Sequence, residues 1–168
     1  IDRVFTTVEQ RHGGDQAGWH VGGLLIQTLL EVPQAWVHLN EIASASKRLV
    51  SLIYGLVDDI ASSGGRVQNK QFRYQLFPKR KTVQTANEEG ILSVDGISPE
   101  LTSSAAHRDA LRSAMMGFLA KWAIHVEHLA GLMADDVKFR EVDIEQIIRR
   151  VLSHMGTEEF GAEGAFDW

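Results

Sequence analysis

The feature that most constrains this chain is a regular run of apolar residues between positions 39 and 60. Its members alternate between spacings of three and four: Leu39, Ile42, Ser46, Leu49, Ile53, Leu56 and Ile60. That spacing places the side chains along one face of an α-helix. Glycines at 64 and 65 follow, where a left-handed helix end is favoured. The pattern therefore predicts a long helix over residues 34–62.

A second run with the same spacing occupies the later part of the chain. Its members are Leu111, Met115, Phe118, Trp122, His125, Leu129 and Leu132. This run predicts a helix over 99–134, and shorter amphipathic patterns predict helices over 1–12, 15–32 and 143–155. Several helices with apolar faces are typical of a helical bundle. The fold class expected from the sequence is therefore mainly all-α, a multi-helix bundle.

Helical periodicity is lost between the two long patterns. Phe72, Tyr74 and Leu76 alternate with polar residues, as in a half-buried strand, and residues 91–94 could form a second short strand. We expect a small β-hairpin or extended insertion at about residues 66–97. The expected organisation is one helical domain over 1–156, followed by a tail over 157–168.

Length and composition narrow the classes of protein. The chain has 168 residues, the usual size of one domain, and no cysteine. Disulfides, thiolate zinc sites and a thiol nucleophile are therefore excluded, and a reducing compartment is favoured. The weakly charged stretch over 15–31 is short and rich in glycine, so a membrane span is not expected and the chain is predicted to be soluble. The sequence does not define the localisation further.

A basic segment near the middle is the first candidate binding site. Residues 66–87 carry six of the 17 basic residues and no acidic one, so the remaining 11 basic and 22 acidic residues give −11 elsewhere. Basic and aromatic side chains together are suited to phosphates and stacked bases, so RNA or single-stranded DNA is a possible partner. The alternatives are a solvated strand face and pairing with acidic groups of this chain or of a second copy. The candidate residues are Arg66, Lys70, Phe72, Arg73, Tyr74, Lys79, Arg80 and Lys81.

The C-terminal tail has the opposite character. It combines four acidic residues with Phe160, Phe166 and Trp168. Aromatic side chains of this kind can dock into an apolar groove of a protein partner, or they can fold back onto the parent domain. A basic segment and an acidic tail in one chain also favour head-to-tail self-association.

Histidines provide the alternative of an enzyme. His125 and His128 would share a helical face and could bind one metal ion, but no third ligand can be identified. The other interpretation is that both are ordinary helix residues with satisfied hydrogen bonds. The adjacent pair Asp58 and Asp59 is interpreted as a solvated helix end, because neighbouring helical side chains diverge by about 100°.

These observations together favour a binding protein over an enzyme. The chain has no phosphate-binding glycine loop and no Gly-x-Ser-x-Gly motif, so no cofactor is expected. The favoured function is a non-enzymatic helical assembly module, oligomeric and nucleoprotein-like or coat-like, that binds a polyanion through residues 66–81. The alternatives are a metal-dependent helical-bundle enzyme that uses His125 and His128, and an adaptor that docks through its tail.

Overall fold

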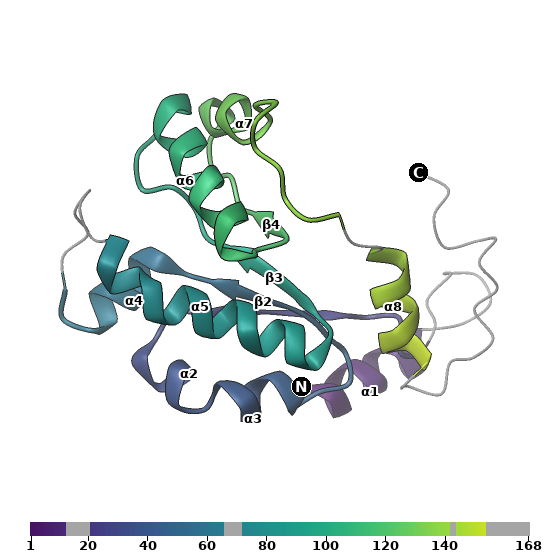
Figure 1. The fold of residues 1–168 in the computed structure, drawn as a ribbon. Helices are drawn as coiled ribbons and strands as arrows, with labels where there is room; N and C mark the ends of the chain where they lie inside the picture. Colours follow the sequence, from purple (N-terminus) through teal and green to yellow (C-terminus); the bar gives the residue numbers. More distant parts are fainter. Residues whose placement is uncertain (13–20, 66–71, 142–143, 154–168) are drawn as a thin grey trace.

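The computed structural model describes residues 1–12, 21–65, 72–141 and 144–153, and it shows an α/β fold. Its centre is a four-stranded sheet in the order β1-β2-β3-β4, in which every neighbouring pair is parallel (Figure 1). The strands are β1 (Ile26–Leu30), β2 (Leu49–Tyr54), β3 (Leu92–Asp95) and β4 (Ala120–Lys121). The prediction of a mainly all-α bundle was wrong.

Helices precede, connect and follow the strands. They are α1 (Asp2–His12), α2 (Pro33–Val37), α3 (Leu39–Ser44), α4 (Leu56–Ser62), α5 (Phe72–Glu89), α6 (Ser103–Met116), α7 (Val126–Leu132) and α8 (Ile144–Ser153). None of these helices, within the described part of the chain, is long and apolar enough to cross a membrane.

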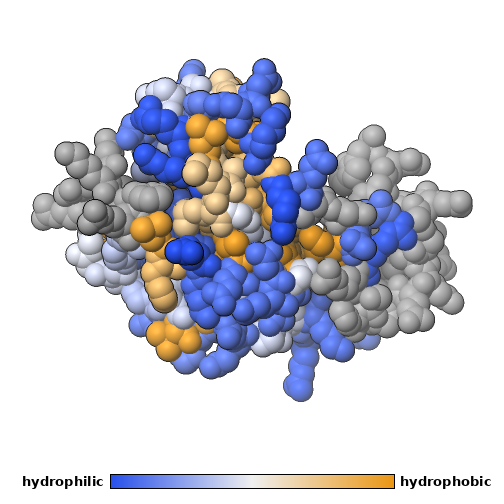
Figure 2. Space-filling view, in the orientation of Figure 1, coloured by the Kyte–Doolittle hydropathy of each residue, from blue (hydrophilic) through white to orange (hydrophobic). Residues whose placement is uncertain are grey.

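The connecting helices α2–α6 cover one face of the sheet. Leu30, Leu52 and Tyr54 point to that face, where the first core cluster joins β1 and β2 to α2, α3 and α5. The second cluster joins Tyr54 to α4 and α5, and Figure 2 shows apolar side chains gathered where α5 meets the α6 region. Sequential parallel strands with helices on one face form the arrangement of half of a (β/α)8 barrel.

The long helix predicted over residues 34–62 is a helix–strand–helix segment. It contains α2, α3, β2 and α4, and all six residues of β2 are buried. A parallel strand covered on both faces has a continuous apolar run, which periodicity cannot distinguish from a buried helix. The regular spacing of the apolar residues 39–60 therefore arises by coincidence from three consecutive short elements, α3, β2 and α4.

The other predicted elements changed for related reasons. The stretch 99–134 contains α6, β4 and α7, and α6 ends at Gly117, whose φ of 94° lies in the left-handed region that favours glycine. The stretch 15–32 contains β1. Residues 72–89 form α5 rather than a strand, so the predicted hairpin is absent, although β3 lies at the second predicted strand.

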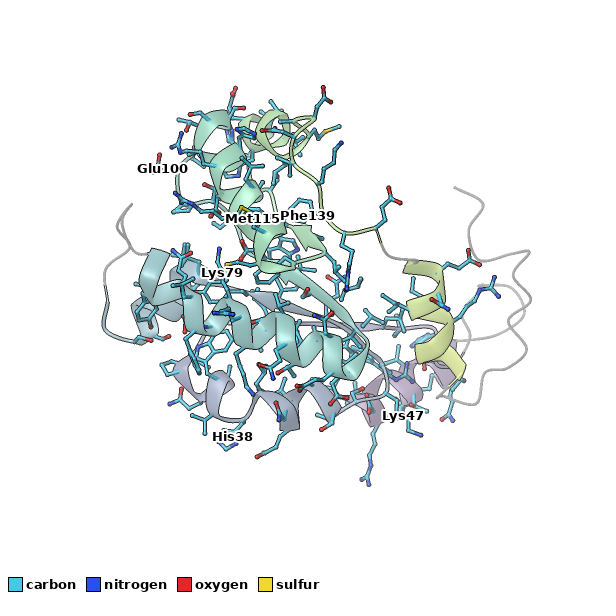
Figure 3. All side chains as sticks on the ribbon, in the orientation of Figure 1. His38, Lys47, Lys79, Glu100, Met115 and Phe139 are labelled. Atoms are coloured by element: carbon cyan, nitrogen blue, oxygen red, sulfur yellow. The ribbon has the colours of Figure 1, made fainter. Side chains whose placement is uncertain are left out.

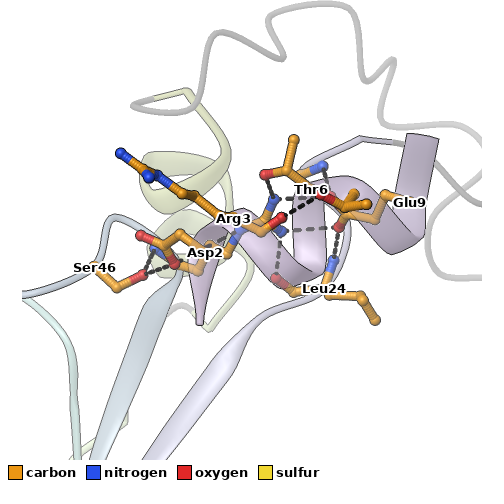
Figure 4. A network of polar contacts seen from close by, with 9 residues as sticks. Asp2, Arg3, Thr6, Glu9, Leu24 and Ser46 are labelled. Carbon is orange, nitrogen blue, oxygen red and sulfur yellow. Dashed lines mark hydrogen bonds and ion pairs between the residues drawn. The ribbon is translucent and has the colours of Figure 1, made fainter. Parts of the chain in front are cut away.

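A buried ion pair fixes α1 to the amino ends of β1 and β2 (Figure 4). The Glu9 carboxylate accepts two hydrogen bonds from the Arg48 guanidinium, each 2.8 Å long, and two more from the backbone N–H groups of Gly22 and Leu24. Arg48 also donates to the Leu24 carbonyl. The amino ends of both strands are therefore held in a fixed position relative to α1.

Candidate active site

Two acidic residues meet at the carboxyl ends of β1 and β2. Glu31 follows the last residue of β1, and Asp58 lies in the first turn of α4, just after β2. The Gly55 N–H donates a hydrogen bond to the Leu30 carbonyl at 2.9 Å, which holds the carboxyl ends of β1 and β2 side by side. Functional side chains of parallel α/β folds gather at this edge of the sheet.

The two carboxylates influence each other electrostatically. The pKa of Glu31 is raised by partial burial, by the negative charge of Asp58 and by a hydrogen bond between the two side chains. Adjacent carboxylates of this kind favour either a shared proton or a bound cation. Mg²⁺ commonly binds through one or two carboxylates and completes its shell with water and substrate oxygens. Glu31 and Asp58 therefore have the chemistry of a carboxylate pair that can bind magnesium.

Gly55 provides the space that Glu31 occupies. A Cβ at position 55 would lie 2.3 Å from Cγ and 2.7 Å from Oε1 of Glu31, so any side chain there would displace the carboxylate. The Ser62 hydroxyl donates to the Glu31 carbonyl at 2.9 Å and links the end of α4 to the end of β1. The backbone on both sides of the carboxylate pair is therefore held in place.

Asp59, the neighbour of Asp58, points in another direction. Its side chain is buried, and Oδ1 accepts from the Trp36 indole N–H at 2.8 Å while Oδ2 accepts from the Tyr54 hydroxyl at 3.2 Å. These contacts connect α4 to α2 and to β2. Burial raises the pKa of the Tyr54 hydroxyl, as does the charge of Asp59, so this hydroxyl stays a donor at neutral pH.

A second buried polar cluster lies at the ends of β3 and β4. Asp95 accepts from Lys79 at 2.8 Å and from Lys121 at 2.9 Å, and it also accepts a hydrogen bond from Ser113. Lys121 pairs with Asp109 on α6 at 2.7 Å. Burial alone would raise the pKa of Asp95, but the charges of Lys121 and Lys79 hold it below its ordinary value. The charges balance within the cluster, which ties α5 and α6 to the sheet.

The predicted basic site is divided by this arrangement. Lys79 is buried on the side of α5 that faces α6 (Figure 3), whereas Arg80 and Tyr74 are exposed. Lys81 is half-buried, and Phe72 and Arg73 lie in the first turn of α5. Arg66 and Lys70 fall outside the described residues. Because α5 is a helix, the adjacent residues Lys79, Arg80 and Lys81 project about 100° apart and do not share one face.

The other predicted site residues lie elsewhere. His125 caps α7 by accepting from the Glu127 N–H, and the buried His128 hydrogen bonds through Nε2 to the Glu100 carbonyl at 3.0 Å. Across the ranges that the structure describes, no group of three metal-binding side chains converges. Phe160, Phe166 and Trp168 fall outside those ranges, so the partner-binding tail stays a prediction.

The comparisons with known proteins identify enzymes. L-malyl-CoA/β-methylmalyl-CoA lyase of Rhodobacter capsulatus is 28% identical over 182 aligned residues, which span 98% of this chain and 54% of the relative. The enzyme of the same name from Cereibacter sphaeroides is 27% identical over the same share of this chain. The chain thus spans about half the length of the curated relatives it matches. No family model matches it.

Solved structures show the same fold at lower sequence identity. A citrate lyase from Burkholderia xenovorans is 20% identical, covers 92% of this chain and 50% of its own, and superposes with a TM-score of 0.67. The magnesium–glyoxylate complex of Haloferax volcanii malate synthase is 21% identical, covers 88% of this chain and 44% of its own, and has a TM-score of 0.60. These likenesses support the α/β fold.

The relatives overturn the functional prediction from the sequence. A non-enzymatic assembly module that binds nucleic acid was expected, and the relatives that match nearly the whole chain are lyases. The alternative of a helical-bundle enzyme is also wrong, because the fold is built on a four-stranded parallel sheet. Glu31 and Asp58 were missed as a site, because a spacing of 27 residues has no meaning until two strands are known to lie side by side. The available signal was an acidic residue after each of two buried apolar runs.

Proposed function

We propose that this chain carries the metal-binding part of the active site of a magnesium-dependent lyase. The observation that carries the proposal is the Glu31–Asp58 pair at the carboxyl ends of adjacent parallel strands. The substrate class that we propose is a small hydroxy acid or its coenzyme A thioester, with L-malyl-CoA as the first candidate. Support comes from the names of the relatives and from one structural neighbour, the malate synthase in complex with magnesium and glyoxylate.

The residues of this chain have separate tasks in the proposal. Glu31 and Asp58 would hold Mg²⁺ from one side and leave its other positions to water and to substrate oxygens. Bound Mg²⁺ would act as a Lewis acid that withdraws electron density from a substrate oxygen. Gly55 keeps the space for Glu31 free, and Ser62 holds the Glu31 backbone.

Metal binding is tested with Mn²⁺, which can replace Mg²⁺ in carboxylate sites and gives an electron paramagnetic resonance signal when free. We expect wild type to bind Mn²⁺ and the variants Glu31→Gln and Asp58→Asn to lose most of that binding. Glu41→Gln is the matched control, because Glu41 is an exposed carboxylate on α3. Equal Mn²⁺ binding by wild type and by both site variants would contradict the metal site.

The reaction is tested separately from the metal. L-malyl-CoA is incubated with the chain, with and without Mg²⁺, and its consumption is followed by mass spectrometry. The proposal predicts consumption that requires Mg²⁺ and disappears in Glu31→Gln. Mn²⁺ binding without consumption of L-malyl-CoA would remove this substrate and leave the metal site intact.

We also propose that the chain self-associates. Within the described residues β1 and β4 each pair with one strand, so the outer edge of each is open, and Leu29 on β1 is 37% exposed. Open strand edges favour pairing with further strands. Light scattering coupled to size exclusion should give a mass above the 18.7 kDa of one chain. A mass equal to one chain would contradict self-association.

A further inference from the structure

We infer that Asp59 is a positioning residue that aims the Asp58 carboxylate at Glu31, acting through its hydrogen bonds to Trp36 and Tyr54. The inference rests on the proposed metal site and extends it to a side chain outside the carboxylate pair. It follows from three properties of the described structure: the geometry of consecutive helical residues, the weak local anchoring of α4, and the direction of the two hydrogen bonds that Asp59 accepts.

Consecutive residues of a helix project about 100° apart around its axis. Asp58 is exposed and reaches Glu31, whereas Asp59 is 1% exposed and points into the protein. Any rotation of α4 about its axis would move both side chains by the same angle. A contact that fixes the direction of Asp59 therefore also fixes the direction of Asp58.

Helix α4 has little local stabilisation of its own. It spans seven residues, and no side chain caps its first turn, where Gly55 is the N-cap residue. Helices of this length are marginal without tertiary contacts. Leu56 and Ile60 anchor α4 in the core, but apolar contacts are not directional and permit small rotations. The Ser62 hydroxyl gives the last turn of α4 one directional contact, and a second directional contact in the first turn would define its rotation close to Asp58.

Asp59 makes two such contacts with two different elements. Oδ1 accepts from Trp36 on α2 and Oδ2 accepts from Tyr54 on β2, so the plane of the carboxylate is defined by donors on both sides. The Trp36 and Tyr54 rings pack at 5.6 Å between centroids, which holds the two donors in place. The partial positive charge at the amino end of α4 also favours a negative charge at position 59.

Stability alone does not account for an acid at position 59. Burying a carboxylate costs free energy, and both of its hydrogen-bond partners are neutral groups. The carboxylate is better explained by the direction that it imposes on α4.

The test compares Mn²⁺ affinity with stability in the full chain. Asp59→Leu removes both hydrogen bonds and keeps the branched shape of the side chain, and Trp36→Phe removes one donor and keeps the aromatic packing. We expect each variant to bind Mn²⁺ about tenfold more weakly or worse, as is usual for groups that orient metal ligands. The free energy of unfolding measured in urea should fall for Asp59→Leu, because the Trp36 and Tyr54 donors lose their acceptor, so Mn²⁺ affinity is compared only among variants that circular dichroism shows to be folded. Ser113→Ala is the control, because it removes a buried hydrogen bond to Asp95 and touches neither β1 nor α4.

Each outcome supports or overturns the inference. Weaker Mn²⁺ binding in both folded variants, with wild-type affinity in Ser113→Ala, supports the positioning role. Wild-type Mn²⁺ affinity in both variants overturns this inference and leaves the proposed metal site standing. No Mn²⁺ binding by wild type overturns both. Should Asp59→Leu fail to fold, the Mn²⁺ affinity of Trp36→Phe alone decides between these outcomes.

Discussion

The ion pair between Glu9 and Arg48 provides a stability prediction whose size follows from the structure. Glu9 accepts four hydrogen bonds, two from Arg48 and two from backbone N–H groups, and its pKa falls from 4.5 to about 2. The hydrogen bonds from Arg48 are the largest cause of that fall, and they outweigh the opposing effect of burial. A difference of this size corresponds to about 3 kcal/mol of folding free energy.

The sign follows from the direction of the pKa. Because the carboxyl has a lower pKa in the folded chain than in the unfolded chain, its stabilisation is complete above pH 4.5 and is lost as the pH falls toward about 2. We expect Glu9→Gln to lose about 3 kcal/mol at pH 7, since it also takes from the buried Arg48 guanidinium its nearest charge partner and leaves the more distant Asp2 carboxylate at 3.9 Å. The difference from wild type should shrink steadily through the acidic range.

The assay is urea unfolding of wild type and Glu9→Gln at several pH values between 7 and the acid limit of wild type. Glu41→Gln provides the control, because it makes the same substitution at an exposed position on α3 and leaves the Glu9–Arg48 pair intact. Two curves of unfolding free energy against pH that run parallel for wild type and Glu9→Gln would refute the reasoning. They would show that the carboxylate has the same pKa in the folded and unfolded chains.

Three further predictions concern the sheet and the candidate site. Without divalent cations, Glu31→Gln should raise the free energy of unfolding at pH 7, because the raised pKa of Glu31 means that its charge opposes folding above pH 4.5. The gain in stability should vanish in urea unfolding below that pH. A loss of stability at pH 7 would contradict this prediction. Gly96→Ala would place a Cβ 2.1 Å from the Tyr54 carbonyl oxygen. Thermal unfolding should therefore show that the free energy of unfolding falls by about 1–3 kcal/mol. An unchanged melting temperature would contradict this close approach. Lys121→Met should lower the free energy of unfolding in urea by about 3–5 kcal/mol, because Asp95 loses a buried charge partner. An unchanged free energy of unfolding would show that water reaches this cluster.

The sequence predicted the first helix better than it predicted the sheet. A helix was expected over residues 1–12, where α1 lies, because an isolated amphipathic helix shows its periodicity directly. Strand β2 gave the opposite result, since a strand that is buried on both faces has no alternation to detect. Gly55, directly after β2, was the local sequence signal against one continuous helix, because glycine is unfavourable inside a helix.

The candidate site was beyond the reach of local patterns. Glu31 and Asp58 are brought together by the parallel pairing of β1 with β2, and that pairing is a long-range property of the sheet. The burial of Lys79 within the basic segment could not be predicted for a related reason. The burial of Lys79 depends on Asp95, which lies 16 residues away on another element. Charge counted along a chain does not reveal which charges are neutralised in the folded protein.

The most direct test of the central claim is a crystal of this chain soaked in Mn²⁺ and measured at the manganese absorption edge. The claim predicts an anomalous density peak between the carboxylates of Glu31 and Asp58, and its loss in a crystal of Glu31→Gln. A peak at other residues only, or a fully soaked crystal with no peak at this pair, would contradict the claim that the carboxyl ends of β1 and β2 form a divalent-cation site.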